Sequence, residues 1–463
     1  MAAPSADDVR LLVDPVVATL EDHLARGGGG ALRRCLELGP AATIEDITRA
    51  GLRGRGGGGF PTGAKWRSIL NGGGRHHYAV CNAAEGEPGT FKDRALLRAN
   101  PYQVLEGLLV AAHTVGAIEA FIALKASFAP EIDRVRTAID EIDRAGWLGD
   151  LKVTVVTGPE EYLFGEEKAL LEVIEGNEPL PRWLPPYLHG LFATAPQLGW
   201  QSHEPEAGHD RGEQSNPTLV NNAETLAQAA WIVAHGADAF RTVGTETSPG
   251  TVLCTVVGDV TTPGVLEVPM GTPLAEVIEL CGGPHPGRQV KAVLAGFAGA
   301  VLDTARLGTP LTYEHFDATG SGLGAAGFIV YDDTACMVEV AAMVSRFLFV
   351  ESCGQCPPCK LGTGYITDAL NRLCAGTGSE ADIARIHERM RSVTDGNRCY
   401  LPVQERTLIS SLLERFPEDF AAHLEGWCPS ERTVPTPKIA DLRDGVATYD
   451  EKQERKQPDW TYR

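Results

Sequence analysis

The chain has 463 residues, a formal net charge of −20, 43% hydrophobic and 22% charged residues, 11 cysteines and 52 glycines. Its length predicts about three domains, and its ordinary balance of hydrophobic and charged residues excludes a wholly disordered chain. The glycines cluster without a three-residue period, which excludes a collagen-like fibre, and the acidic charge disfavours electrostatic binding to nucleic acid.

The N-terminal segment, residues 1–45, has helical periodicity, and Asp7 and Asp8 precede its first apolar run, unlike a signal peptide. No stretch of the sequence has the ~20 uncharged apolar residues of a spanning helix. We therefore expect a cytoplasmic protein without direct membrane insertion. In that reducing compartment the cysteines are expected to be metal ligands or buried side chains rather than a disulfide framework.

Short apolar runs alternate with helical patterns over residues 46–244, which predicts an α/β domain with a largely parallel sheet. A polar, non-periodic stretch near 183–216 interrupts this domain and is interpreted as an insertion. The expected strands are 78–81, 120–124 and 152–157, and the expected helices are 101–115, 132–145 and 166–175.

The remaining chain divides into three zones. Residues 245–330 contain short β-rich runs separated by Pro-Gly and Gly-Gly turns, which predicts a small α+β module. Residues 331–426 carry four helical patterns, which predict a four-helix bundle. The polar, proline-containing tail, 427–463, is expected to be an extended arm.

Three cysteines recur at three-residue intervals as Cys353, Cys356 and Cys359. This spacing lets three thiolates surround one face of a [4Fe–4S] cluster, and Cys399 is the candidate for the fourth thiolate. Zinc, which also accepts four thiolates, remains an alternative, although zinc sites usually present paired Cys-x-x-Cys units. The other cysteines are interpreted as small buried side chains: Cys35, Cys81, Cys254, Cys281, Cys336, Cys374 and Cys428.

A glycine-dense loop, GLRGRGGGGFPTGAKW (51–66), is a candidate for binding a phosphate or a flavin. Glycines let backbone N–H groups converge on an anion, and Arg55 or Lys65 can add positive charge. The loop matches neither the dinucleotide fingerprint nor the Walker loop, and an ordinary flexible loop is the alternative interpretation.

Three further segments support a ligand site. CNAAEGEPGTFKDR (81–94) follows a predicted strand, where α/β folds place ligand-contacting loops. YLFGEE (162–167) places two carboxylates at a helix start, where they either answer the helix dipole or accept hydrogen bonds from a ribose or a carboxamide. NPTLVNNAET (216–225) supplies amides suited to a flavin ring, although Asn222 can also be a plain N-cap.

Together these segments resemble the family of NADH-binding flavoprotein subunits of respiratory complex I, which includes diaphorase subunits of NAD-linked hydrogenases and formate dehydrogenases. The resemblance covers roughly residues 45–425. It implies an α/β Rossmann-like domain for FMN and NAD(H), a ubiquitin-like SLBB module, and a C-terminal four-helix bundle with a [4Fe–4S] cluster. It also implies other subunits of a redox complex as partners, including a thioredoxin-like [2Fe–2S] subunit, and a place peripheral to the membrane through that complex.

The resemblance assigns residues by motif position. Glu87 and Glu167 would lie closest to the nicotinamide as the catalytic pair. Phe60, Glu85 and Glu166 would lie near FMN and NADH. The FMN-binding set would be Gly54, Gly56, Gly57, Lys65, Asn82, Gly165, Asn221, Asn222 and Thr225.

The sequence departs from the family pattern in places. Ala84 stands where complex I members usually carry Asp, and Tyr187 stands in a segment that often ends in Phe-Pro. The insertion changes the expected NADH entrance, and its histidines, His189, His203 and His209, are interpreted as inert rather than as metal ligands. These departures favour a paralogue in a soluble or peripheral NAD-linked complex.

Three functions remain open from the sequence. The first is NADH oxidation through FMN and the cluster. The second uses the same groups as the NAD⁺-reducing end of a formate dehydrogenase or hydrogenase, whose catalytic metal would lie in a partner chain. The third is a non-catalytic electron-transfer adaptor that retains only the cluster.

Overall fold

The computed structural model describes residues 10–74, 76–194, 214–428, 430 and 432–462. The chain divides into two compact units. The first unit comprises Met1–Glu85 and Asp93–Val252, and the second comprises Gly86–Lys92 and Leu253–Arg463. The seven residues Gly86–Lys92 therefore belong to the second unit, although the chain on both sides of them belongs to the first unit.

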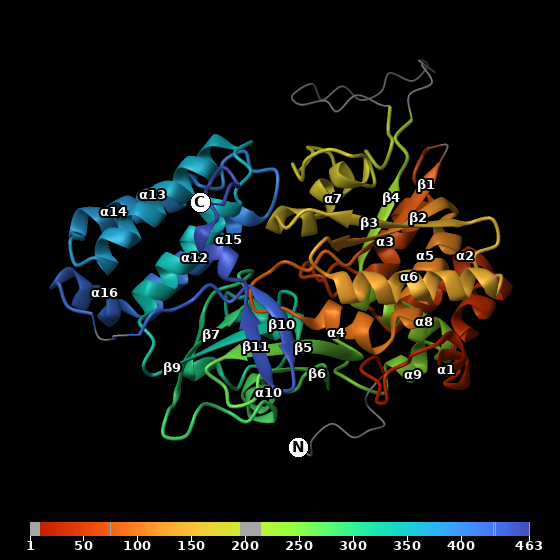
Figure 1. Cartoon of the computed structure of the whole chain (residues 1–463), viewed down its shortest axis with the longest axis horizontal. Helices are drawn as coiled ribbons and strands as arrows, with labels where there is room; N and C mark the ends of the chain where they lie inside the picture. Colours follow the sequence, from red (N-terminus) through yellow and green to blue (C-terminus); the bar gives the residue numbers. More distant parts are fainter. Residues whose placement is uncertain (1–9, 75, 195–213, 429, 431, 463) are drawn as a thin grey trace. The chain divides into compact units, whose positions relative to one another are not determined.

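The first unit is built on a four-stranded parallel sheet with strand order β3-β2-β1-β4 (Figure 1). All four carboxyl ends therefore lie at one edge of the sheet. The strand bounds are His77–Asn82 for β1, Ala117–Lys125 for β2, Lys152–Gly158 for β3 and Thr218–Asn222 for β4.

Helices cover both faces of this sheet, which is why most residues of its central strands, β1 and β2, are apolar and buried. On one face, Tyr78 and Val80 of β1 pack with Leu170 and Leu171. These two leucines belong to the helix α7, and Figure 1 shows α5 and α8 beyond the opposite face. The helix bounds are Leu20–Ala25 (α1), Gly30–Ala50 (α2), Thr62–Leu70 (α3), Lys92–Ala99 (α4), Pro101–Val115 (α5), Ala129–Arg144 (α6), Glu167–Ile174 (α7), Ala223–His235 (α8) and Ala237–Phe240 (α9).

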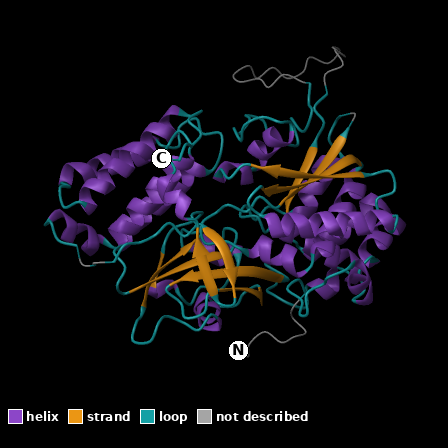
Figure 2. Cartoon of the chain, viewed as in Figure 1, coloured by secondary structure: helices purple, strands orange, loops and turns teal. Residues whose placement is uncertain are grey.

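The second unit contains a five-stranded mixed sheet with strand order β6-β5-β9-β7-β8 (Figure 2). β5 pairs with β9 in parallel, and β9 pairs with β7 in antiparallel orientation. The expected α+β module is thus confirmed. Its elements are Thr251–Gly258 (β5), Gly264–Pro269 (β6), Leu274–Leu280 (α10), Val290–Ala295 (β7), Leu302–Asp303 (β8), Tyr313–Ala318 (α11) and Gly327–Asp332 (β9).

The helical region follows this sheet, and the four expected helices are present with a fifth short one. Pro417 starts the fifth helix because its ring and missing N–H favour a new first turn over continuation of the preceding helix. The bounds are Met337–Glu351 (α12), Pro357–Cys374 (α13), Glu380–Ser392 (α14), Leu401–Arg415 (α15) and Pro417–Leu424 (α16).

The tail differs from the extended arm that the sequence predicts. It folds back as an antiparallel hairpin, β10 (Ile439–Arg443) and β11 (Val446–Tyr449), followed by a 3₁₀ turn, Glu451–Arg455. Asp444 and Gly445 both have positive φ and make the tight turn. The polar composition of the tail hid its packing, since the side chains that it buries completely are polar ones, Gln453 and Lys456.

None of the helices in the described part of the chain is both long enough and apolar enough to cross a bilayer.

Candidate flavin and iron–sulfur sites

Two neighbouring parallel strands, β1 and β4, end side by side in asparagines. Asn82 is in register with Asn222, and Cys81 is in register with Asn221. The carboxyl edge of a parallel sheet is where α/β folds bind ligands, because loops from adjacent strands diverge there and leave a crevice. The fold thus brings together the two predicted segments 81–94 and 216–225.

The backbone of the glycine loop lies close to this edge of the sheet. A Cβ on Gly56 would lie 3.0 Å from the Cβ of Asn222, and Gly57 has a φ of +116° that favours glycine. The backbone N–H of Arg55 donates to the Thr225 hydroxyl at 2.8 Å. The predicted FMN-binding residues of the two segments are therefore adjacent, and a side chain at Gly56 would fill the space between them.

Arg55 was one of two candidates for a positive charge facing a bound anion, and the structure gives its guanidinium a different role. Its buried guanidinium donates to the carbonyl oxygens of Pro249 and Thr251, at 3.3 and 3.0 Å, and lies 3.9 Å from the buried Glu224 carboxylate. These contacts anchor the loop to the body of the first unit. Lys65 is the cation that remains half-exposed at the site, where its ammonium pairs with Glu167 at 2.8 Å.

A network of amides joins the remaining segments. Asn82 donates to the Gly165 carbonyl at 2.7 Å, and Asn222 donates to the Asp93 carboxylate at 2.6 Å. Asn221 accepts from the Trp66 indole N–H at 2.7 Å. These bonds fix the orientation of each amide.

The two carboxylates at the start of α7 have different partners. Glu166 is the N-cap and accepts from the backbone N–H groups of Lys168 and Ala169 at 2.9 and 3.0 Å, so the helix-end interpretation is correct for it. Burial raises the pKa of Glu166 to about 7, and its neighbour Glu167 opposes its ionisation further. Glu167 pairs with Lys65 instead. Its side chain is more exposed than that of Glu166, so it is the more accessible of the two carboxylates to a ligand.

The segment 81–94 divides between the two units. Glu85 belongs to the first unit, where its buried carboxylate accepts from the Arg94 guanidinium and the Asp93 N–H, each at 3.1 Å. Glu87 belongs to the second unit, where it accepts from the Phe297 N–H at 3.0 Å. Glu85 therefore has a structural partner that its assignment as a cofactor residue did not anticipate.

The residues of the first unit suit a planar, phosphorylated ring system such as FMN. A Cβ at Gly56 would press on Asn222, amides line the strand ends, and Phe60 is 59% exposed and available for stacking. A second close approach occurs at Gly165, where a Cβ would lie 3.1 Å from the Ala84 carbonyl oxygen.

The cluster cysteines gather at the bundle. Cys353, Cys356 and Cys359 lie where α12 gives way to α13, and Cys399 lies just before α15. Their sulfur atoms are not among the described groups whose ligand atoms converge within 4.8 Å, the spacing suited to one metal ion. A cubic cluster needs thiolates spread more widely around it than a single ion does.

Polar contacts hold the cysteine loops in place. Arg398, next to Cys399, donates to the Gln355 side chain at 2.8 Å, which ties the fourth cysteine to the Cys353–Cys356 turn. The Ser352 hydroxyl lies 3.3 Å from the buried Cys359 sulfur. Such outer contacts orient thiolate ligands and tune a cluster.

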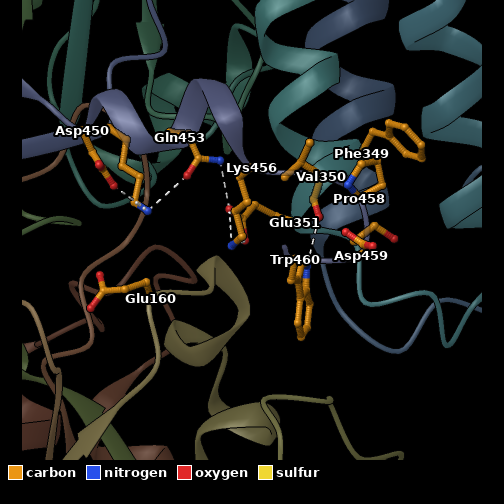
Figure 3. A network of polar contacts seen from close by, with 12 residues as sticks. Glu160, Phe349, Val350, Glu351, Asp450, Gln453, Lys456, Pro458, Asp459 and Trp460 are labelled. Carbon is orange, nitrogen blue, oxygen red and sulfur yellow. Dashed lines mark hydrogen bonds and ion pairs between the residues drawn. The ribbon is translucent and has the colours of Figure 1, made fainter. Parts of the chain in front are cut away.

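The tail supports the same loop, as Figure 3 shows. Lys456 pairs with both carboxylate oxygens of Glu351, two residues before Cys353, at 2.9 Å, and both side chains are almost completely buried. The Trp460 indole donates to the Val350 carbonyl at 3.0 Å. Lys360, next to Cys359, donates to the Pro458 carbonyl at 2.6 Å. The tail thus contacts both ends of the triple-cysteine segment.

The insertion is only partly described. His203 and His209 lie outside the described residues, while His189 is buried and its pKa is lowered by that burial.

Most of the single cysteines are buried, as expected. Five of the seven are buried, namely Cys35, Cys81, Cys254, Cys281 and Cys336, whereas Cys374 and Cys428 are half-exposed.

Several residues of these sites escaped the sequence reasoning. Asp93, Arg94 and Trp66 lie inside the quoted motifs, so their type and position were visible. Asp93 and Trp66 bind partners 129 and 155 residues away, whereas Arg94 pairs with Glu85 of its own motif. The pair of Lys456 and Glu351 had no sequence signal, because 105 residues separate them.

Comparisons with known proteins match this geometry. Residues 47–231 match the Nuo51 FMN-binding domain, residues 253–298 the SLBB domain, and residues 339–423 the NADH-ubiquinone oxidoreductase-F iron–sulfur binding region. These matches confirm the predicted fold class and the choice of a [4Fe–4S] cluster over zinc.

Relatives extend the match over most of the chain. An NADH-quinone oxidoreductase subunit of Rhizobium meliloti is 37% identical over 419 residues, 88% of this chain and 94% of the relative. The NADP-reducing hydrogenase subunit HndC of Solidesulfovibrio fructosivorans is 34% identical, covering 90% of this chain and 83% of HndC.

Solved structures of hydrogenase chains share the fold of this chain. A chain of the air-oxidized NAD⁺-reducing [NiFe]-hydrogenase superposes with a TM-score of 0.75 at 30% identity, covering 91% of this chain and 68% of that chain. In the H₂-reduced state the TM-score is 0.72 at 31% identity, and the match spans 83% of this chain but 63% of that longer chain. The protein therefore belongs to the family of FMN-binding NADH-quinone oxidoreductase subunits, oxidoreductases that carry FMN and a [4Fe–4S] cluster within multisubunit complexes.

Proposed function

We propose that this chain exchanges electrons between NAD(H) and a partner subunit, with FMN held in the first unit and the cluster held by Cys353, Cys356, Cys359 and Cys399 in the second. FMN, when bound, takes up an electron pair with a hydride and gives up electrons singly. The observation that carries the proposal is the convergence of the glycine loop, the strand-end asparagines and the α7 carboxylates at one sheet edge.

The side chains of the first unit bind and orient rather than react. Gly54, Gly56 and Gly57 bring the loop backbone to the phosphate end, and Asn82, Asn221, Asn222, Gly165 and Thr225 define the strand-end side of the cradle. Lys65 places a positive charge where either a flavin or a phosphate can share it with Glu167.

Phe60, Glu166 and Glu167 form the side of the site assigned to the nucleotide. An exposed phenyl ring gives a stacking surface, and Glu167 can exchange its contact with Lys65 for a hydrogen bond from a carboxamide or a hydroxyl. Glu87, by its position in the 81–94 motif, is assigned with Glu167 as one of the two carboxylates closest to the nicotinamide.

The partners are other redox subunits, among them a thioredoxin-like [2Fe–2S] protein that receives electrons from the cluster. The assembly places this chain at the periphery of a larger complex. Full-length relatives named as subunits of NADH-quinone oxidoreductase and of hydrogenase support this proposal.

A second candidate is the NAD⁺-reducing end of a hydrogenase or formate dehydrogenase. The specific observation in its favour is the superposition on NAD⁺-reducing [NiFe]-hydrogenase over 91% of this chain. The two candidates share one site and differ in the direction of electron flow.

Steady-state assays of anaerobically purified protein, analysed for bound flavin and iron, test both. NADH oxidation with a soluble one-electron acceptor and NAD⁺ reduction by a reduced viologen are measured on the same preparation. Protein that retains the cluster but lacks flavin and both activities would support the non-catalytic adaptor and contradict both enzyme proposals. Purification of the native complex then identifies the partner subunits.

A further inference from the structure

A second cluster of metal-binding side chains lies apart from the four cluster cysteines. The ligand atoms of Cys336, His423 and Cys428 all lie within 4.8 Å of one another. The Cys336 sulfur is 3.2 Å from Nε2 of His423, and both residues are buried. Within the described chain, this is where thiols and an imidazole converge to the spacing of a single ion.

The three side chains come from separate pieces of the second unit. Cys336 is the N-cap residue of α12, His423 lies in the last turn of α16, and Cys428 lies in the segment after that helix. Neither composition nor spacing pointed to this set, since 87 residues separate Cys336 from His423.

The imidazole is oriented as a metal ligand. Nδ1 of His423 lies 3.0 Å from the Leu373 carbonyl oxygen. A carbonyl only accepts, so Nδ1 carries the proton and the lone pair of Nε2 is directed toward the sulfur atoms. A backbone or carboxylate acceptor behind the ring is the usual outer contact of a metal-binding histidine.

An acidic oxygen completes the surroundings. Oε2 of Glu339, one turn into α12, is buried without a hydrogen-bond partner among the described residues. The Glu339 carboxylate interacts electrostatically with His423 and with the Arg432 guanidinium. Glu339 is not among the residues whose ligand atoms converge within 4.8 Å, so its carboxylate is an outer charge near the site rather than a ligand.

We propose that Cys336, His423 and Cys428 bind one zinc ion. Two thiolates and an imidazole are the donor set that zinc prefers, at about 2.3 Å for sulfur and about 2.0–2.1 Å for nitrogen. Ligand atoms at those distances from a tetrahedral ion lie roughly 3.5–3.8 Å apart. The Cys336 sulfur and Nε2 of His423 are 3.2 Å apart, and no two of the three ligand atoms are more than 4.8 Å apart, so small side-chain movements would admit the ion. The ion would join the start of α12 to α16 and to the beginning of the tail.

Metal analysis of the full chain tests the proposal. Protein purified anaerobically with FMN and cluster, then dialysed against a mild chelator, is expected to retain one zinc in addition to four irons per chain. Cys428→Ala is expected to lose at least 80% of the zinc and to keep FMN and iron. Cys281→Ala, which removes a buried cysteine of the α+β module, is the matched control and keeps all three.

X-ray absorption at the zinc edge of the wild-type protein gives a result that does not depend on a variant folding. Two sulfur ligands with at least one nitrogen ligand support the site. Four sulfur ligands together with less than four irons would show zinc misloaded at the cluster cysteines and overturn the proposal. No retained zinc, which leaves only a thiol–imidazole hydrogen bond, or equal zinc in Cys428→Ala, would also overturn it.

Discussion

At the scale of single residues, the flavin site depends on where a side chain is absent. Gly56 and Gly58 belong to the same loop, yet a Cβ on Gly56 would press on Asn222, whereas a Cβ on Gly58 would meet nothing within 4 Å. Sequence reasoning identifies the glycine run but not which members of it are required, because the requirement comes from a strand far along the chain.

This contrast gives the first prediction. Gly56→Ala is expected to weaken FMN binding at least tenfold, since Asn222 must move and its hydrogen bond to Asp93 is lost. Gly58→Ala is the matched control and is expected to bind FMN as the wild type does. Fluorescence titration of FMN into flavin-free protein measures both, and equal affinities would contradict the proposed cradle.

The second prediction concerns Glu166, whose pKa burial raises to about 7 from an ordinary value of 4.5. The folded state therefore favours the protonated form, so the carboxyl group costs stability as pH rises from about 4.5 to about 7. Glu166→Gln retains a capping oxygen but cannot ionise.

Urea unfolding of the NADH-free proteins measures the effect. Relative to Glu166→Gln, the wild type is expected to lose about 1–3 kcal/mol of unfolding free energy between pH 5 and pH 8. Parallel stability profiles over that range would show that the Glu166 pKa is not raised. Glu167→Gln, at the more exposed neighbour, serves as the control.

At the scale of elements, the first unit rests on the close contact of α5 with α8. A Cβ on Gly107 would lie 2.0 Å from the Leu226 carbonyl oxygen, a backbone atom that cannot rotate away. Gly107→Ala is expected to destabilise the unit by about 3 kcal/mol or more. Gly30→Ala, whose Cβ would have ordinary contact at 3.9 Å, is expected to be neutral in the same thermal unfolding assay. Equal melting temperatures for the two variants would argue against this packing.

The tail provides the corresponding element in the second unit. Lys456→Ala would leave the Glu351 carboxylate buried without its cation, which costs about 3–5 kcal/mol. We expect this variant to lose iron severalfold faster under air than the wild type, followed by absorbance. Lys452→Ala, at an exposed lysine of the tail, is the control. Equal rates of iron loss for the two variants would show that the Lys456–Glu351 pair does not help to retain the cluster.

Elements were easier to predict than their contacts. The strands β1, β2 and β3, the helices α5, α6 and α7 and the bundle helices follow from local periodicity, which the sequence displays directly, whereas β4 and α8 were not predicted. The tail hairpin was missed because its turn, Asp444-Gly445, joins two short polar strands. The α16 helix was missed because it is eight residues long and begins at a proline that reads as a terminator.

At the scale of the whole molecule, the two cofactors are assigned to different units of one chain. The residues proposed to bind FMN lie in the first unit, and the cysteines proposed to bind the cluster lie in the second. The motif order implied this division, but the excursion of residues 86–92 into the second unit was not predictable, since its hydrogen bonds go to residues distant in sequence, Phe297, Pro437 and Thr255. The net charge of −20 remains without a specific role beyond disfavouring nucleic acid.

Anaerobic mixing of the cofactor-loaded protein with NADH tests the central claim most directly. Rapid optical spectra are expected to show bleaching of the flavin, followed in wild-type protein by reduction of the cluster in freeze-quenched paramagnetic resonance. Cys399→Ala should bleach like the wild type without the signal of a complete [4Fe–4S] cluster. Flavin that stays oxidised in excess NADH would contradict the account.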